Sequence, residues 1–436
     1  MEITPFNSNN NSPEGSPVHS PAKVLPVLSP SFYLKYGNII TKMKELAFTK
    51  RLKRLRSQSK PSSTTLDLHV FQLFENFCVA LKENKSLEDL NLSGVSMSAL
   101  MFSRLMQALS QHIKLKSLNF GLTDLSNLSL KYICRTLKEN PNIYKLNLFH
   151  VSILRENLRD LTELLTYNKS LEEINLNFCD IGNEIVKDYC EGLVKARNIV
   201  KIKLAKNGFE KNSWKALGFF LAKVKYQRKI KKLDLSYNNI SSPELSILGG
   251  YLNKIDLCRR NIRTNKSCDF IENLKLNSNK IRGKEAIEQL NEIIIGLGKM
   301  QKLGLAKNHL ENQDLIDLGP SFERIHKKID LSRNNFDDEI SENLDFFRNL
   351  KFLDVSHNKL GRRACEKLSA FLKKSQNIEI LDISDNNIGS SGFERLCEAL
   401  NENKTLKILK VNRTEIEKIK KFRDLRENFS IKSLEI

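Results

Sequence analysis

The sequence predicts an α/β solenoid in which short parallel strands form a concave sheet and helices cover the convex side. Two observations predict this fold. The motif LxxLxL recurs along most of the 436 residues, and stretches with helical spacing follow the copies, as at residues 393–400. A single unit cannot bury its own apolar face, so consecutive units must stack.

The motif sets the predicted strands in order. The first five copies begin 28 residues apart, at Leu87, Leu115, Ile143, Leu171 and Ile199. Later copies begin at Ile230, Ile271, Met300, His326, Leu350, Ile378 and Leu406, and a truncated copy begins at Ile431. A half-unit, Leu66-Asp-Leu68, is predicted to open the sheet. The expected total is about 13–14 strands.

An asparagine follows many of these strands, with an apolar residue two positions later. The asparagines are Asn238, Asn279, Asn308, Asn334, Asn358 and Asn386, and Cys179 occupies the same position in an earlier unit. Backbone groups at a buried turn need hydrogen-bond partners. We therefore expect these side chains to bond backbone groups where the chain leaves the strand.

The repeated pattern resembles the leucine-rich repeat superfamily. Its 28-residue period with a helical second half is similar to the ribonuclease-inhibitor-like subclass, and the resemblance covers residues 61–436. It implies a horseshoe-shaped domain with the sheet on the concave face. It implies little about function, because this fold carries many functions.

One stretch departs from the period, near residues 249–270. Leu233 and Leu274 are 41 residues apart, and residues 252–257 could form a short degenerate unit. The alternative is an inserted loop rich in Arg259, Arg260, Arg263 and Lys266. Later intervals of 26 and 24 residues predict less helix behind those strands. We expect two arcs joined at this irregular junction.

Two segments precede the repeats. Residues 1–30 are rich in Asn, Ser and Pro and are predicted to be a disordered tail. Its Ser-Pro pairs and two serines that follow arginines are candidate phosphorylation sites: Ser12, Ser16, Ser20, Ser29, Ser57 and Ser59. Such pairs are also ordinary in a disordered tail.

Residues 31–60 are strongly basic and have helical spacing. Three interpretations stay open for this segment. It is a solvated helix docked on the repeats, a contact for an acidic partner, including a membrane surface met by residues 39–56, or a nuclear localisation signal. It lies outside the repeats in each case.

Composition excludes several classes of protein. The net charge is +20, the 8 cysteines form no CxxC pair, and no apolar run has the length of a membrane span. The polar start MEITPFNSNN is unlike a secretory signal. We expect a cytoplasmic protein, with a nuclear location as the alternative. We expect Cys78, Cys134, Cys190, Cys365 and Cys397 to pack in the core.

Catalytic and metal-binding patterns are absent from the sequence. It has no GxxxxGK[ST] loop, GxSxG, HExxH or kinase signature, and the 7 histidines lack metal-ligand spacing. We therefore expect no catalytic residue, no metal and no cofactor.

Outward positions of the predicted strands form the default binding surface of a solenoid. The early strands present a row of asparagines, Asn91, Asn119, Asn147 and Asn175. The middle strands and their turns present cations, which we call the basic band: Lys201, Lys203, Lys206, Lys232, Lys275, Lys302, Lys307, Lys328 and Arg333. We predict that this band contacts an acidic partner.

A second candidate surface lies on the last strands. Phe352, Ile380 and Ile408 occupy neighbouring outward positions, with Asp354 and Asp382 beside them. Three large apolar side chains on an open sheet face predict a contact site, which we call the apolar patch. The alternative is that the C-terminal segment or the basic N-terminal helix covers them.

These features favour a non-enzymatic intracellular scaffold. The resemblance implies a cytoskeletal, ciliary or centrosomal assembly, because basic members of this subclass are frequent there. One alternative is a Ran-type GTPase-activating protein, built from similar 28-residue units but usually with an acidic tail, whereas this sequence ends at Ser433-Leu-Glu-Ile436. The other is a nucleic-acid-associated adaptor, which the lack of interleaved aromatics disfavours. The sequence indicates no oligomeric state.

Overall fold

The computed structural model describes residues 64–84, 86–95, 97–110, 112–196, 198–225, 230–259, 271–340, 344–412 and 433–435. The predicted tail 1–30, the basic segment 31–60 and the six candidate phosphorylation sites lie outside these residues. Within the described residues, no helix combines the length and the apolarity needed to cross a bilayer.

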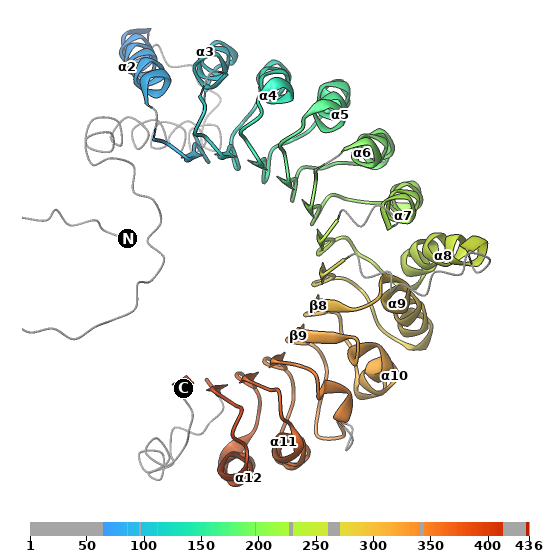
Figure 1. The fold of residues 1–436 in the computed structure, drawn as a ribbon. Helices are drawn as coiled ribbons and strands as arrows, with labels where there is room; N and C mark the ends of the chain where they lie inside the picture. Colours follow the sequence, from blue (N-terminus) through green and yellow to red (C-terminus); the bar gives the residue numbers. More distant parts are fainter. Residues whose placement is uncertain are drawn as a thin grey trace, which may run out of the picture.

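A parallel sheet of 13 strands, paired in chain order, lines the inside of an arc (Figure 1). This confirms the predicted solenoid. The strands are β1 (Asp89–Asn91), β2 (Ser117–Asn119), β3 (Lys145–Asn147), β4 (Glu173–Asn175), β5 (Lys201–Lys203), β6 (Lys232–Asp234), β7 (Asn273–Lys275), β8 (Met300–Gly304), β9 (Ile325–Asp330), β10 (Phe352–Asp354), β11 (Ile380–Asp382), β12 (Ile408–Lys410) and β13 (Ser433–Glu435).

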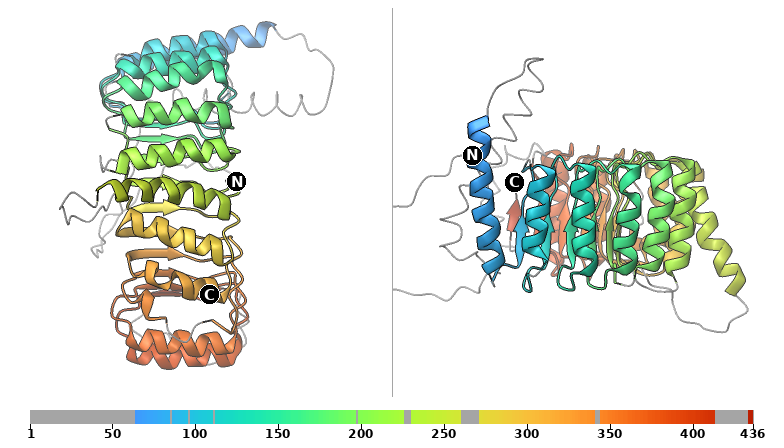
Figure 2. Two further views of the ribbon diagram at one scale, coloured as in Figure 1. Left: turned by 90° about the vertical axis from the view of Figure 1, so that its right-hand side faces the viewer. Right: turned by 90° about the horizontal axis from the view of Figure 1, so that it is seen from above.

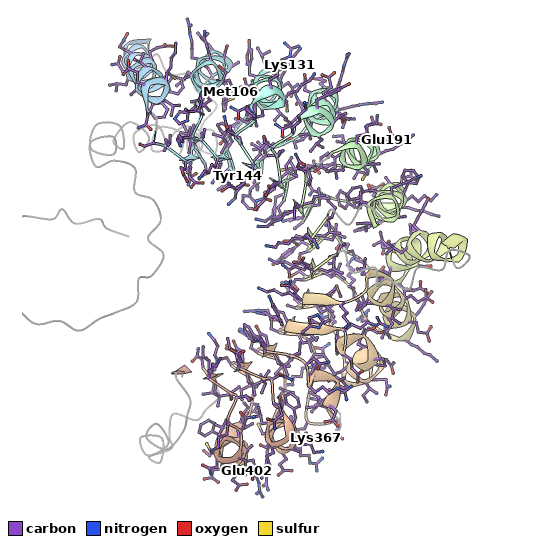
Figure 3. The ribbon with its side chains drawn as sticks, viewed as in Figure 1. Met106, Lys131, Tyr144, Glu191, Lys367 and Glu402 are labelled. Carbon is purple, nitrogen blue, oxygen red and sulfur yellow. The ribbon has the colours of Figure 1, made fainter. Side chains whose placement is uncertain are left out.

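Helices form the outer layer and lie side by side along the arc (Figure 2). They are α2 (Thr64–Glu83), α3 (Ala99–Leu109), α4 (Asn127–Glu139), α5 (Leu158–Tyr167), α6 (Asn183–Lys195), α7 (Lys211–Lys225), α8 (Ser242–Arg259), α9 (Lys284–Leu297), α10 (Asn312–Phe322), α11 (Arg362–Lys374) and α12 (Gly389–Glu402), with 3-10 turns η1 (Arg155–Asn157) and η2 (Asp345–Phe347). In Figure 3, Lys131, Glu191, Lys367 and Glu402 lie on these outer helices.

The motif leucines form the core between the two layers. Leu118, Leu146 and Ile174 pair in register on adjacent strands and are fully buried. Each strand from β1 to β12 adds one such buried residue to a continuous apolar column, so each unit completes the burial of its neighbour. The cysteines expected in the core lie on helices, at Cys78, Cys134, Cys190, Cys365 and Cys397, and only the last is partly exposed.

The expected asparagine turns are present and are joined to one another. The Nδ2 group of Asn308 donates to the carbonyl oxygens of Leu276 and Leu305, both at 3.0 Å. Its Oδ1 accepts from the N–H of Ile281, and its own N–H donates to Oδ1 of Asn334 at 3.0 Å. The same asparagine ladder contains Asn207, Asn238, Asn279, Asn308, Asn334, Asn358 and Asn386.

The half-unit predicted at Leu66 and Leu68 is wrong. Both residues lie in α2, and the sheet begins at β1. Phe74, Phe77 and Leu81 of α2 are buried. The helix thus covers the apolar end of the first unit. A further strand in this place would itself need a neighbour to bury its core face.

The extra unit favoured at residues 252–257 is also wrong. These residues belong to α8, and β6 pairs directly with β7 through Leu233 and Leu274. The sheet is therefore continuous across the predicted junction between two arcs. Leu248, Leu252 and Ile255 follow one another at intervals of four and three residues, which is helical spacing, and Leu252 and Ile255 also match the first half of the LxxLxL motif. Residues 260–270, with the remaining basic positions, lie outside the described part.

The prediction that short units contain less helix holds for one of the two units, because the 26-residue unit keeps α10, which has 11 residues like α3. Between β9 and β10 the described residues contain only η2, a single 3-10 turn. The preceding 26-residue interval has a different effect, because the register of β8 and β9 shifts between Met300 and Lys302. Ile325 pairs with Met300 and is fully buried, so it fills the core position that the motif assigned to His326.

Candidate protein-interaction surfaces

Strand register gathers the predicted cations on the concave face. Lys201 pairs with Lys232, Asn273 pairs with Lys302, and Lys302 pairs with Lys328. Adjacent strands lie about 4.8 Å apart, so the lysines form two closely spaced pairs, Lys201 with Lys232 and Lys302 with Lys328, separated by the uncharged Asn273. Lys203 and Lys275 lie one residue further along their strands.

Carboxylates neutralise part of the basic band. Glu173 contacts Lys201 at 2.8 Å and Lys203 at 3.3 Å, between the Nζ and Oε1 atoms. Burial opposes ionisation of Glu173, but the hydrogen bond and charge of Lys201 and the charge of Lys203 outweigh it and lower the pKa of this carboxyl. Burial, with the charge of Lys201, lowers the pKa of Lys203. This end of the band is therefore internally paired.

The centre of the band is less neutralised. Lys232, Lys302 and Lys307 are exposed and form no ion pair with any residue in the described ranges. Lys275 lies 3.9 Å from Asp234, and more than half of its side chain is exposed. The centre therefore offers the positive charge that is most available to an acidic partner.

Three cations of the band lie on the rim of the sheet, in the turns that follow the strands. Lys206, Lys307 and Arg333 have φ between 52° and 57°, in the left-handed region. Large side chains are uncommon there. Their N–H groups donate to carbonyl oxygens of the next turn, at 2.9–3.0 Å, which fixes this conformation. The slot recurs in each unit from β1 to β11, and we call it the rim column: Gly94, Leu122, His150, Phe178, Lys206, Tyr237, Ser278, Lys307, Arg333, His357 and Asp385.

The rim column changes chemistry along the arc. Phe178 lies 5.2 Å from Phe149 and 6.3 Å from Tyr237, between ring centroids. The ammonium of Lys206 lies 4.9 Å from the Phe178 centroid. Further on, the Arg333 guanidinium contacts the His357 ring at 3.1 Å. The column therefore passes from an aromatic cluster to a charged segment.

Strand register brings the apolar side chains of the patch next to one another. Phe352 pairs with Ile380, which pairs with Ile408, and all three are partly exposed. The Lys328 ammonium lies 3.9 Å from the Phe352 centroid, so the basic band ends against the patch. Glu379 borders it and is held by Lys351 at 2.7 Å. Hydrogen bonds from Lys351 and Lys407 lower the pKa of this carboxyl to about 2.

The asparagine row and its aspartate equivalents have a local role. Oδ1 of Asn147 accepts from the Phe149 N–H at 3.0 Å, and Oδ1 of Asp354 and of Asp382 accept from Ser356 and Ser384 in the same way. The amide or carboxylate caps the turn that follows its strand. Asp354 and Asp382 thus have a structural function at the positions where we predicted partner contacts.

A sequence profile described as Leucine Rich repeat matches residues 167–188, 226–243, 348–369 and 374–397. These matches coincide with the strand, turn and helix units seen in the structure. The chain is a leucine-rich repeat protein. Proteins of this kind generally bind protein partners, so the repeats support an interaction scaffold. The profile describes the repeat in general and leaves the ribonuclease-inhibitor-like subclass a prediction.

Solved leucine-rich repeat structures were found at low identity. An internalin from Listeria monocytogenes is 13% identical, with 82% of this chain and 88% of that chain covered and a TM-score of 0.44. The complex of TLR13 with ssRNA13 is 19% identical, with 76% and 50% covered and a TM-score of 0.44. No curated protein matches this sequence. At these TM-scores the likenesses carry no functional implication for this leucine-rich repeat protein.

The rim column is the surface that sequence reasoning missed in this leucine-rich repeat protein. Three of its cations were included in the basic band, but the aromatic members were not identified. The available signal was position alone, because each residue directly precedes the turn slot that holds Asn, Cys, Val or Thr, as Tyr237 precedes Asn238. Among the described residues, no group of three or more His, Cys, Asp or Glu is arranged to hold a metal ion.

Proposed function

We propose that the protein is a cytoplasmic scaffold that binds an acidic partner of a cytoskeletal, ciliary or centrosomal assembly through the basic band. The observation that carries this proposal is the exposed centre of the band, Lys232, Lys302 and Lys307. A positive surface attracts acidic partners over several ångströms and speeds their association. Actin and tubulin polymers are acidic, so they fit this surface.

The apolar patch forms the second half of the proposed interface. Charged residues at the edge of an interface mainly set the association rate and the choice of partner, whereas buried apolar side chains supply most of the binding energy. Phe352 joins the two surfaces, because Lys328 of the band lies over its ring. A partner that follows the concave face would contact lysines first and the apolar side chains of β10–β12 at its far end.

Cosedimentation of the full chain with microtubules, and separately with actin filaments, tests this proposal. The test variant carries Lys232→Glu and Lys302→Glu on the concave face. The control carries Lys215→Glu and Lys284→Glu, two exposed lysines on the convex helices α7 and α9. We expect the concave reversal to weaken binding to one polymer by about tenfold or more, and added salt to weaken wild-type binding steeply.

Each outcome of this experiment bears on the proposal. Equal losses in the concave and convex variants would show that net charge alone drives binding. Absence of wild-type binding to both polymers would exclude them as partners. Loss of binding on deletion of residues 1–60, with no effect of the concave reversal, would place the contact in the basic N-terminal segment instead.

A further inference from the structure

The turns after β4–β9 enclose a groove of about 450 Å³ on the rim of the sheet. Small side chains leave room along it, at Ala205, Ser236, Ser278, Ala306 and Ser332. Longer side chains border it, at Phe178, Tyr237, Lys275, Lys307 and Arg333. Five strand spacings separate β4 from β9, which is roughly 24 Å, or about seven residues of an extended peptide.

One end of this rim groove is aromatic. Phe178 is the centre of the cluster, with Phe149, His150 and Tyr237 all within 6.3 Å of its centroid. Tyr237 is 49% exposed. An exposed aromatic side chain beside a groove is a favourable contact for an apolar side chain of a partner.

The other end of the rim groove is basic. Its lining contains Lys275, Lys307 and Arg333, against one carboxylate, Asp234, which is paired with Lys275. The surplus positive charge favours an acidic occupant. Both ends therefore define a ligand with an apolar side chain at one end and carboxylates at the other.

Two asparagines in the lining supply hydrogen-bond donors. Oδ1 of Asn177 accepts from the Ala205 N–H at 2.7 Å, and Oδ1 of Asn277 accepts from the Ala306 N–H at 3.0 Å. These bonds hold each amide in place. Neither Nδ2 group has a hydrogen-bond partner among the described residues, so both can donate to the backbone carbonyls of an extended peptide.

The geometry of the rings distinguishes a peptide from a nucleic acid. Base stacking needs an open ring face. The Lys206 ammonium lies over the Phe178 ring. The planes of the Phe149 and Tyr237 rings are inclined to the Phe178 plane by 55° and 48°. These neighbours surround the Phe178 ring and leave the exposed Tyr237 ring for contact, which suits one side chain better than a stack of bases.

We propose that the rim groove binds an extended acidic peptide carrying one aromatic side chain, which docks against Tyr237 and Phe178. This inference names a binding site within the proposed scaffold function and rests on it only for the acidity of the partner. The rim groove shares Lys275, Lys307 and Arg333 with the basic band, but its lining does not include Lys232 and Lys302, so the variants that test the two proposals change different side chains.

Fluorescence anisotropy with the full chain tests the proposal. The probe is a labelled peptide with one tryptophan near one end and glutamates over the rest, and the comparison probe has alanine in place of tryptophan. We expect the tryptophan probe to bind about tenfold more tightly, and Tyr237→Ala to remove that advantage without changing binding of the alanine probe. Arg333→Glu should weaken both probes.

Two controls make the result specific. Lys232→Glu, outside the groove lining, should change binding of the tryptophan probe much less than Arg333→Glu. Because Tyr237 is exposed, its replacement should leave the circular dichroism and the unfolding midpoint of the protein unchanged. Tyr237→Phe should retain the tryptophan advantage, since the ring is kept.

Three results would overturn the proposal. Equal binding of the two peptides would show that charge alone is recognised. An unchanged tryptophan advantage in Tyr237→Ala would move the site away from the groove. Tighter binding of single-stranded oligothymidine than of the tryptophan peptide, lost in Tyr237→Ala, would assign the groove to nucleic acid. Loss of polymer binding in the variant with Lys232→Glu and Lys302→Glu, with peptide binding kept, would not contradict the peptide site.

Discussion

The units of β1–β4 and those of β5–β11 build the same turn with different chemistry. In the first region Val95, Thr123, Val151 and Cys179 fill the slot after the strand, and the strands follow at a constant 28 residues. In the second region asparagines fill the slot, and the interval between neighbouring asparagines ranges from 24 to 41 residues. The number of residues per unit thus varies only in the region with the asparagine ladder.

The difference teaches what holds consecutive units in register. Each ladder asparagine bonds the turns of its own and the neighbouring unit, as Asn238 does with the carbonyls of Leu235 and Leu204. These bonds do not depend on how many residues lie between the strands. In the first region register depends on apolar packing of helices and turns of equal length, so the constant period is needed there.

The largest effect is expected from breaking the ladder. Asn308→Ala leaves the carbonyls of Leu276 and Leu305 and the N–H of Ile281 without their side-chain partner in a buried turn. Each buried unsatisfied group costs about 1–3 kcal/mol, so we expect a loss of about 3–5 kcal/mol. The midpoint of urea unfolding, followed by circular dichroism, measures it.

The same slot in the first region provides the matched control. The Thr123 hydroxyl makes only long hydrogen bonds, 3.4 Å to the carbonyls of Leu92 and Gly121. We expect Thr123→Val to cost less than about 1 kcal/mol. Equal losses in the two variants would contradict the different roles that we assign to the slot.

A smaller effect is expected where the ladder region adapts to an unusual residue. Gly304 occupies the strand position at which Asn147 and Asp354 cap their own turns, and Asn277 caps the Ala306 N–H instead. A Cβ at Gly304 would lie 2.6 Å from Oδ1 of Asn277. We expect Gly304→Ala to cost about 1–3 kcal/mol, measured by thermal and urea unfolding.

Gly250, which lacks such contacts, provides the control for the Gly304 variant. Gly250 lies within α8, and a Cβ there meets nothing within 4 Å. We expect Gly250→Ala to stabilise the protein by about 0.5–1 kcal/mol, because alanine favours helix. A loss of the same size in both variants would mean that the contact with Asn277 has no special cost.

The smallest effect should come from making a late strand resemble an early one. Asp354 lies between Asp330 and Asp382 on adjacent strands, where β1–β4 have asparagine. Burial, followed by the Asp330 charge, raises the pKa of the Asp354 carboxyl above its usual 3.8. A raised pKa means that the folded state binds this proton more strongly than the unfolded state, so ionisation at neutral pH opposes folding.

Asp354→Asn should therefore stabilise the protein at neutral pH. We expect a gain of about 0.2–1 kcal/mol, because opposed like charges are removed while the Ser356 N–H keeps an oxygen acceptor. The gain should shrink as the pH falls through the raised pKa toward 3.8, where wild-type Asp354 becomes protonated. A series of urea unfolding curves at decreasing pH tests this, and a gain independent of pH would refute it.

The leucines that alternate along each strand predicted the fold, because their burial is the same in every unit. The misses have physical causes. Leu66 and Leu68 lie two residues apart in a helix, where the short pattern LxL is equally compatible with α2. The rim column was missed because any residue type occupies it, from Gly94 to Phe178 and Arg333. Its chemistry appears only when register places the turns side by side.

The rim column also bears on how such a surface changes over evolutionary time. Its backbone conformation is set by hydrogen bonds between N–H and carbonyl groups of consecutive turns, as from Tyr237 to Asn277, so the side chain itself contributes little to folding. One substitution then alters one point of an evenly spaced row and leaves the core intact. Recognition can diverge residue by residue in lineages that keep the same scaffold.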